Sequence, residues 1–213
     1  FPLIGLLIGS ILVGAHHALT RWTPPLVTSA LVLGRWILIS GALHLDGLAD
    51  ACDGLYGGRS PEERLRIMKD PHIGTIAVVV LSVHLILKFT MIHSLPSSEI
   101  VPALLLVPCL GRYAMVILGT TLPYARTEAG TAALFVRHAT VRSLLAATAL
   151  ALLLSWLVAG QRGLGLFGVV GGGTLILRAL FSRTLGGVTG DALGATGELS
   201  ESILLLSLLL RST

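Results

Sequence analysis

Residues 26–54 read LVTSALVLGRWILISGALHLDGLADACDG, an apolar run that passes without a break into an acidic one. The apolar part is long enough to cross a bilayer, which takes about 17–25 residues. The acidic part, HLDGLADACDG, carries three carboxylates, in a chain with only 11 Asp and Glu residues in all. The sequence therefore predicts a membrane helix that leads directly to a cluster of carboxylates.

In a helix, Asp46, Asp50 and Asp53 occupy positions i, i+4 and i+7, so they fall within an arc of about 60° on one face. Three like charges on one face repel, and a purely structural helix gains nothing from them. A divalent cation would turn that repulsion into attraction, and hard oxygen ligands suit Mg²⁺ or Mn²⁺. We predict that these three carboxylates bind such an ion.

The composition is that of a membrane protein. Of 213 residues, 54% are hydrophobic and 12% are charged, whereas soluble domains carry about 25% charged residues. We predict one polytopic transmembrane domain over residues 1–213, embedded in the lipid bilayer. The net charge of +4 comes from basic residues scattered among apolar spans, a pattern that orients a protein in the bilayer and excludes a nucleic-acid partner. Cys52 and Cys109 form no CxxC pair, so we expect free thiols.

Seven apolar stretches predict an all-α, polytopic membrane helix bundle with about seven transmembrane helices. The stretches are residues 1–19, 26–43, 73–95, 102–122, 143–160, 164–181 and 189–210. The sequence leaves the oligomeric state open, a homo-oligomer included.

The Lys and Arg residues between these stretches are unevenly distributed, with eight in one set of connections and three in the alternate set. The eight are Arg59, Arg64, Arg66, Lys69, Arg126, Arg137, Arg142 and Arg183, and the three are Arg21, Arg162 and Arg211. By the positive-inside rule the larger set faces the cytoplasm. We therefore expect the acidic stretch, and the start of the last span, at the cytoplasmic edge of the membrane.

Residues 60–63 (SPEE) predict the start of a short helix, with Ser60 as its N-cap. The helix is expected to end near residue 70, and the acids of its first turn are interpreted as a solvated face. Lys69 and Asp70 adjoin the entry to the next span, at the membrane edge, so they are candidates for a role in the site.

A second acidic segment, residues 190–201 (GDALGATGELSE), opens the last apolar stretch. Its acids Asp191, Glu198 and Glu201 share one helix face. A carboxylate inside a span is costly and indicates a functional site by default, although these acids would lie in the headgroup zone if the span began later. Gly190 and the small residues after it let a helix or a ligand approach the backbone closely.

Two acidic helices at one membrane edge would form a carboxylate cage for one or two Mg²⁺, an ion that shares its coordination with substrate phosphates. This favours phosphoryl-transfer chemistry on a diphosphate. Arg126, at the cytoplasmic end of a span, is a candidate phosphate ligand. Arg112, in mid-span, needs either a partner carboxylate or a substrate phosphate, and the sequence leaves both open. His44 stands close enough to Asp46 to orient a ligand or move a proton, whereas His84 is interpreted as a bundle residue with a satisfied hydrogen bond.

At these residues the sequence resembles the cobalamin synthase family, adenosylcobinamide-GDP ribazoletransferase. The segments HLDGLAD (44–50) and GGVTGD (186–191) are together a specific signal. The resemblance continues in FPLIG (1–5), DG (53–54), RLRIMKDPHIGT (64–75), GR (111–112) and YARTEAG (124–130), with Glu198 and Glu201. Members of the family usually begin some tens of residues earlier, so we expect a segment before Phe1.

The resemblance implies a Mg²⁺-dependent enzyme that joins adenosylcobinamide-GDP to α-ribazole, or its 5′-phosphate, and releases GMP in the last assembly step of adenosylcobalamin. From their charge and placement, the predicted metal ligands are Asp46, Asp50, Asp53, Asp191 and Glu198, with Mn²⁺ as a substitute ion. The predicted catalytic residues are Asp46, His44 and Asp70, with His44 or Asp70 as the general base. The predicted substrate-binding residues are Lys69, Arg112, Arg126 and Gly190.

Two alternatives remain at this point. A CDP-alcohol phosphotransferase also displaces a nucleoside monophosphate with an acidic, Gly-containing motif, but its pattern has an Arg where this chain has Asp50. An ion-coupled transporter would place its acids near the middle of the bilayer, whereas these acids cluster at one predicted edge.

Overall fold

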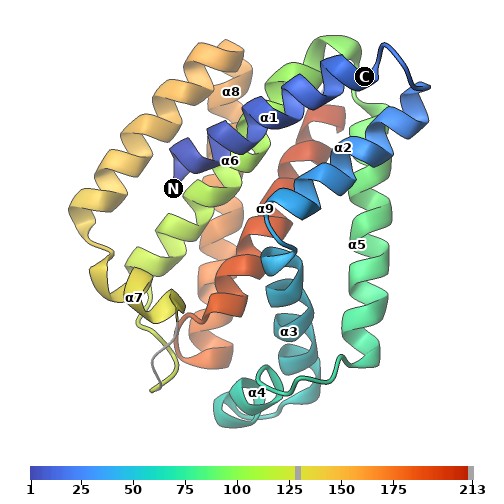
Figure 1. Ribbon diagram of the computed structural model, residues 1–213. Helices are drawn as coiled ribbons and strands as arrows, with labels where there is room; N and C mark the ends of the chain where they lie inside the picture. The colour runs from blue at the N-terminus through green and yellow to red at the C-terminus, as the bar shows by residue number, and fades with distance from the viewer. Residues whose placement is uncertain (128–130, 211–213) are drawn as a thin grey trace.

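The computed structural model describes residues 1–127 and 131–210, and this part of the chain is helical with no strands (Figure 1). The helices are α1 (Pro2–Leu19), α2 (Pro25–Ile39), α3 (Leu43–Gly57), α4 (Pro61–Ile67), α5 (Thr75–Ser94), α6 (Ser97–Thr121), α7 (Thr131–His138), α8 (Val141–Leu185) and α9 (Gly190–Leu210). The predicted all-α class is confirmed. Glu128, Ala129 and Gly130 of the family-like segment, and Arg211 of the loop count, lie outside the described residues.

Five helices are long and apolar enough to cross a membrane, namely α1, α5, α6, α8 and α9, and the bent pair α2 and α3 would add a sixth span. The chain is therefore a multi-pass membrane helix bundle, as predicted. Helix α6 is its centre, because 72% of the residues in its apolar stretch are buried, against 28% in α1 and in α5. The lipid-facing helices keep apolar side chains on their outer surfaces, as a bilayer requires.

Helix α8 is divided by a reversal at Gly160, where the backbone is non-helical (φ 55°, ψ −132°). At about 1.5 Å per residue its 45 residues would far exceed the ~30 Å of a hydrocarbon core if they ran straight. In Figure 1 the first arm rises at the left and the second returns behind α6 and α9. The two arms correspond to the predicted spans 143–160 and 164–181, while the count of seven crossings stays a prediction.

The predicted span 26–43 is wrong in its last part, because the helix breaks before the acidic stretch. Helix α2 ends at Ile39, and α3 starts at Leu43 after a bend of 83°. Gly41 and Ala42 form the bend with left-handed backbone, at φ 58° and 57°. Glycine adopts this conformation freely, whereas alanine does so at a cost of about 1–2 kcal/mol.

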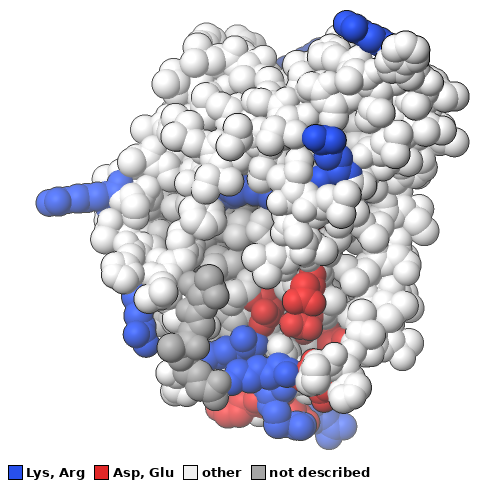
Figure 2. Space-filling view, in the orientation of Figure 1, with Lys and Arg blue, Asp and Glu red and all other residues white. Residues whose placement is uncertain are grey.

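Helix α3 carries the acidic stretch, so the helical prediction for that stretch is confirmed. The short helix predicted after it is α4, where the Ser60 side chain accepts a hydrogen bond from the Glu63 backbone N–H at 3.2 Å. On the face shown in Figure 2, the acidic side chains gather at the lower end of the bundle, next to a group of Lys and Arg. The upper part of that face shows isolated Lys or Arg side chains and no acidic ones.

Candidate active site

Helices α3 and α9 pack closely because glycines lie at their contact. A Cβ atom on Gly47 would lie 2.9 Å from the Asp191 Cα, and one on Gly194 would lie 3.1 Å from the His44 Cα. Only residues without a side chain permit this approach. The expectation that Gly194 lets another helix come close is confirmed, and the contact brings the first acids of α3 beside the first acid of α9.

Asp46, Asp50 and Asp191 form what we call the aspartate group. Asp50 lies within electrostatic range of Asp46 and Asp191, and Asp191 within range of Asp46. One cation is paired with them, since Arg126 Nη2 lies 2.7 Å from Asp191 Oδ2. The group therefore keeps an excess of negative charge, which suits a divalent cation with hard oxygen ligands.

The Arg126–Asp191 pair is held in place by a short stretch of paired backbone. The Ala125 N–H donates to the Val188 carbonyl at 2.9 Å, and the Val188 N–H donates to the Pro123 carbonyl at 2.8 Å. This bridge fixes the chain that follows α6 against the chain that precedes α9. As a result, Arg126 faces the first turn of α9.

A cavity of about 300 Å³ opens beside the aspartate group, and we call it the apolar cavity. Four predicted site residues line it: His44, Asp46, Gly190 and Asp191. The rest of its wall is formed by Phe1, Leu43, Met115, Ala132, Phe135, Leu193 and Gly194. Its polar side chains come from α3 and α9, and its aromatic ones from the N-cap of α1 and from α7, a mixture found in many pockets for small organic ligands.

A second cavity of about 620 Å³ contains three basic side chains, and we call it the basic cavity. Those side chains belong to Arg66, Lys69 and Arg126. The Arg126 guanidinium touches both regions, because it lines this cavity and pairs with Asp191 of the apolar cavity. Its Nε is buried and has no hydrogen-bond partner within the described chain. A buried donor of this kind can bind an anionic oxygen.

Asp53, a predicted metal ligand, also lies within electrostatic range of Asp50, but both of its carboxylate oxygens are occupied by backbone N–H groups of α5. Its Oδ2 accepts from the Gly74 N–H at 2.6 Å and its Oδ1 from the Ala77 N–H at 2.9 Å. Gly74 is the N-cap of α5 and Ala77 lies in its first turn. Asp53 therefore caps α5 from α3, satisfying backbone donors that the helix itself leaves unpaired.

Asp70, a predicted general base, is exposed and lines a third cavity with Asp53 and Tyr56, apart from the aspartate group. The His72 backbone N–H donates to Asp70 at 3.0 Å, and this bond lowers the pKa of the Asp70 carboxyl. A lower pKa makes a carboxylate a weaker base. The structure therefore favours a proton acceptor nearer to the apolar cavity.

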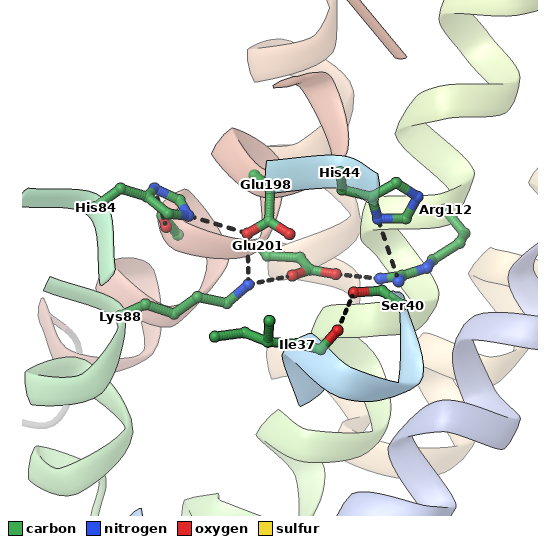
Figure 3. A network of polar contacts seen from close by, with 9 residues as sticks. Ile37, Ser40, His44, His84, Lys88, Arg112, Glu198 and Glu201 are labelled. Carbon is green, nitrogen blue, oxygen red and sulfur yellow. Dashed lines mark hydrogen bonds and ion pairs between the residues drawn. The ribbon is translucent and has the colours of Figure 1, made fainter. Parts of the chain in front are cut away.

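Glu198, the fifth predicted metal ligand, lies in a buried ion-pair network with His84, Lys88, Arg112 and Glu201 (Figure 3). Lys88 Nζ lies 2.7 Å from Glu198 and 2.5 Å from Glu201. The His84 ring Nε2 lies 3.0 Å from the Glu198 carboxylate. Two carboxylates are thus balanced by two cations, which is what burial of charge in a membrane demands.

Arg112 completes this network through an ion pair with Glu201. Of the two possibilities that the sequence left open for Arg112, the structure provides the partner carboxylate. The interpretation of His84 as a satisfied bundle residue is confirmed by its contact with Glu198. Lys88 was missed, although a Lys in the middle of an apolar stretch is itself a signal.

His44 connects the network to the apolar cavity. Its Nδ1 lies 3.4 Å from Arg112 Nη2. A guanidinium only donates hydrogen bonds, so Nδ1 must accept and the ring proton must reside on Nε2. In this tautomer His44 offers the cavity an N–H donor, which differs from the predicted role as a general base.

Comparison with known proteins decides the family. Residues 1–209 match the family described as cobalamin-5-phosphate synthase. The chain belongs to this family. A relative from Pseudomonas savastanoi pv. phaseolicola, named adenosylcobinamide-GDP ribazoletransferase, is 45% identical over 99% of this chain and 86% of its own length.

Other members of the cobalamin-5-phosphate synthase family carry the same name. One from Pseudomonas aeruginosa is 42% identical over 99% of this chain and 85% of its own, and one from Acetivibrio thermocellus is 36% identical over 96% and 83%. No solved structure matches the chain significantly. The predicted family is confirmed, and with it the prediction of a transferase of cobalamin biosynthesis.

For a cobalamin-5-phosphate synthase, the fit of the residues to Mg²⁺ can be tested on their chemistry. The aspartate group supplies three carboxylates in mutual electrostatic range, the donor type that Mg²⁺ prefers. No group of three or more His, Cys, Asp or Glu side chains within residues 1–127 and 131–210 is already arranged around a metal position. Carboxylate oxygens suit the ion, and three of the five predicted ligands would supply them, but in the described chain these side chains are not gathered around one metal position.

Proposed function

We propose that this protein is an adenosylcobinamide-GDP ribazoletransferase. It joins adenosylcobinamide-GDP to α-ribazole, or to α-ribazole 5′-phosphate, and releases GMP. The observation that carries the proposal is the Arg126–Asp191 ion pair, which links the basic cavity to the apolar cavity at the aspartate group. A diphosphate and an acceptor alcohol can meet at this junction.

In the reaction, an oxygen of a ribazole hydroxyl forms a bond to the phosphorus attached to cobinamide. The bond from that phosphorus to the bridging oxygen breaks, and GMP leaves with the second phosphate. The hydroxyl proton passes to a carboxylate that lines the apolar cavity, where Asp46 and Asp191 lie. Holding both reactants at one junction supplies the orientation on which such substitutions depend.

The basic cavity binds the diphosphate. Arg126 donates from its buried Nε and its Nη groups, and Arg66 and Lys69 of the same cavity add positive charge. Arginine suits this task because its fork of N–H groups matches phosphate oxygens. His44 donates from Nε2 on the other side of the junction, toward a phosphate oxygen.

Mg²⁺ is the proposed cofactor, and Mn²⁺ can replace it. Asp46, Asp50 and Asp191 are the residues that would hold it. The ion supplies neutralisation of the negative charge on the diphosphate and on its leaving group. Asp53 and Glu198 act instead through the contacts described above, as a helix cap and as a partner of Lys88.

The protein is proposed to lie in the inner membrane with its site toward the cytoplasm. The excess of Lys and Arg in the connections on the side of α4 supports this orientation. Soluble substrates would then reach both cavities from the compartment in which nucleotides are made.

Purified protein in detergent should release GMP from adenosylcobinamide-GDP only when α-ribazole and Mg²⁺ are both present. Asp46→Asn should lower turnover by about 10²-fold or more, the scale of losing a charged group at a reacting centre. Arg183→Gln, at an exposed position on α8, is the matched control and should keep full activity. A folded wild-type protein that releases no GMP under these conditions overturns the proposal.

A further inference from the structure

The lining of the apolar cavity suits a ligand that has one polar part and one apolar part. Its polar side chains are those of His44, Asp46 and Asp191, and the other lining side chains are hydrocarbon, thioether or aromatic. Its volume of about 300 Å³ lies at the lower limit of small-molecule pockets, about 300–1,000 Å³. A small, compact ligand group fits this space better than a large one.

We propose that the apolar cavity binds the planar aromatic base of the ribazole acceptor and thereby aims its ribose at the aspartate group. The proposal rests on the proposed function and adds to it the position of one substrate. Nothing about the corrin or the guanine nucleotide is needed for it.

Aromatic side chains supply the first argument. The rings of Phe1 and Phe135 lie 4.6 Å apart between centroids, tilted by 37°, and both line the cavity. They present ring faces and edges against which a flat base can pack. Met115, on the wall formed by α6, has a flexible thioether that adapts to aromatic ligands.

The polarity of the two bases supplies the second argument. Guanine carries hydrogen-bonding groups along most of its edge, and burial without partners is costly for each of them. The benzimidazole of ribazole carries hydrocarbon along most of its edge, so it loses little in an apolar wall. Guanine fits better in the basic cavity, whose lining includes the polar side chains of Glu62 and Arg66.

The direction of the cavity supplies the third argument. Asp46 and Asp191 line the cavity from α3 and α9, whereas Phe135 lines it from α7. A base seated against Phe135 can therefore direct the attached ribose toward these carboxylates. The attacking hydroxyl then lies next to a proton acceptor and to the Arg126–Asp191 junction. Binding of the base thus positions the reacting oxygen.

The test uses two variants with a substitution in the wall of the apolar cavity and one control variant with a substitution outside it. Phe135→Ala removes the aromatic wall, and Leu43→Asn places an amide at the exposed rim, where the side chain has little role in the core. Leu134→Ala is the matched control, because Leu134 is exposed on the same helix α7 and does not line the cavity. Full-length protein in nanodiscs is used, with α-ribazole binding measured by calorimetry and both KM values measured by GMP release.

We expect each wall variant to weaken α-ribazole binding, and to raise the KM for α-ribazole, by about tenfold or more. The KM for adenosylcobinamide-GDP should change less than about twofold, and Leu134→Ala should change neither constant. Unchanged α-ribazole binding in a folded wall variant overturns the proposal, and so does a rise only in the KM for adenosylcobinamide-GDP. If Phe135→Ala does not fold, Leu43→Asn alone decides.

Failure of the proposed function gives a different result. In that case wild-type protein releases no GMP, while the calorimetric titration with α-ribazole still reports on the cavity. A titration of active wild-type protein with α-ribazole well above its KM could instead show no binding. That result would overturn the proposal for the apolar cavity without contradicting the proposed function.

Discussion

Arg112 donates to Nδ1 of His44 across the contact between α6 and α3, with 3.4 Å between the two nitrogens. Arg112 is in turn paired with Glu201, and this ion pair holds the guanidinium in its orientation toward His44. This contact fixes which nitrogen of His44 carries the proton. It therefore determines what His44 can do in the apolar cavity.

If His44 acts as a donor from Nε2, a glutamine should replace it in part, since its amide N–H₂ extends to a similar position. We expect His44→Gln to lower kcat by about tenfold and His44→Ala by about 10²–10³-fold, the loss found for a single donor to a reacting oxygen. Rates of GMP release at saturating substrates check this. Equal losses in the two variants would instead support a general base.

The ion-pair network should be important for stability. Lys88 lies between Glu198 and Glu201, with its Nζ 4.4 Å from the Trp36 ring centre. Removing one partner of a buried pair leaves a charge uncompensated, at a cost of about 3–5 kcal/mol. Lys88→Met should therefore lower the thermal unfolding midpoint in detergent markedly.

Two further variants test the cause of that loss. The double variant Lys88→Met, Glu198→Gln should recover part of the lost stability, because it removes the carboxylate that loses its cation, whereas Glu201 keeps its ion pair with Arg112. Arg183→Met removes an exposed positive charge and should leave the midpoint nearly unchanged. A single variant Lys88→Met as stable as wild type would contradict the role assigned to the network.

Substitutions of Asp53 and of Asp46 should have different effects on stability and activity, although both residues belong to the predicted acidic face. Asp53 caps α5, so Asp53→Ala should destabilise the protein by about 0.5–2 kcal/mol, as the loss of a cap does. Asp53→Asn keeps one acceptor oxygen and should retain much of the activity. Unfolding midpoints and rates of GMP release, compared with Asp46→Asn, distinguish the two residues. If a stable Asp53→Asn variant had no activity, the result would support the original prediction that Asp53 is a metal ligand.

Close packing of α3 on α9 should be sensitive to a single methyl group. A Cβ on Gly47 would lie 2.9 Å from the Asp191 backbone, and overpacking of this kind costs about 1–3 kcal/mol. Gly47→Ala should lower both stability and turnover, because it moves Asp46 and Asp191 apart. Gly34→Ala is the matched control, since a Cβ in the middle of α2 meets nothing within 4 Å. It should be neutral or slightly stabilising, and equal behaviour of the two variants would contradict the packing argument.

The sequence was sufficient for the apolar helices and for the acidic face because both are local patterns. Length and hydropathy identified the spans, and the spacing of Asp46 and Asp50 identified their shared face. The bend after Ile39 was not predictable in this way. It depends on left-handed backbone at Ala42, which local preference disfavours and tertiary packing imposes.

The partners of the charged residues were harder to predict, because they are far apart in the chain. Glu198 and Asp191 share one face of α9, yet the first meets α5 and the second meets Arg126. Residue types and spacing alone do not distinguish a carboxylate that is neutralised by Lys88 from one that remains available to a cation. Only the packing of helices against one another makes that distinction.

The network of Lys88 and Arg112 with the two glutamates also has a consequence for how the chain is inserted during synthesis. Lys88 is made 113 residues before Glu201, so α5 and α6 enter the bilayer with cations that have no counter-ion yet. Each such charge costs about 2.5–3.5 kcal/mol on insertion scales, and this cost is not offset until α9 is present. Arrival of the last helix neutralises both cations in one step. A chain that stops before α9 therefore keeps two uncompensated cations in its apolar helices, whereas in the completed chain the network of Lys88, Arg112, Glu198 and Glu201 carries no net charge.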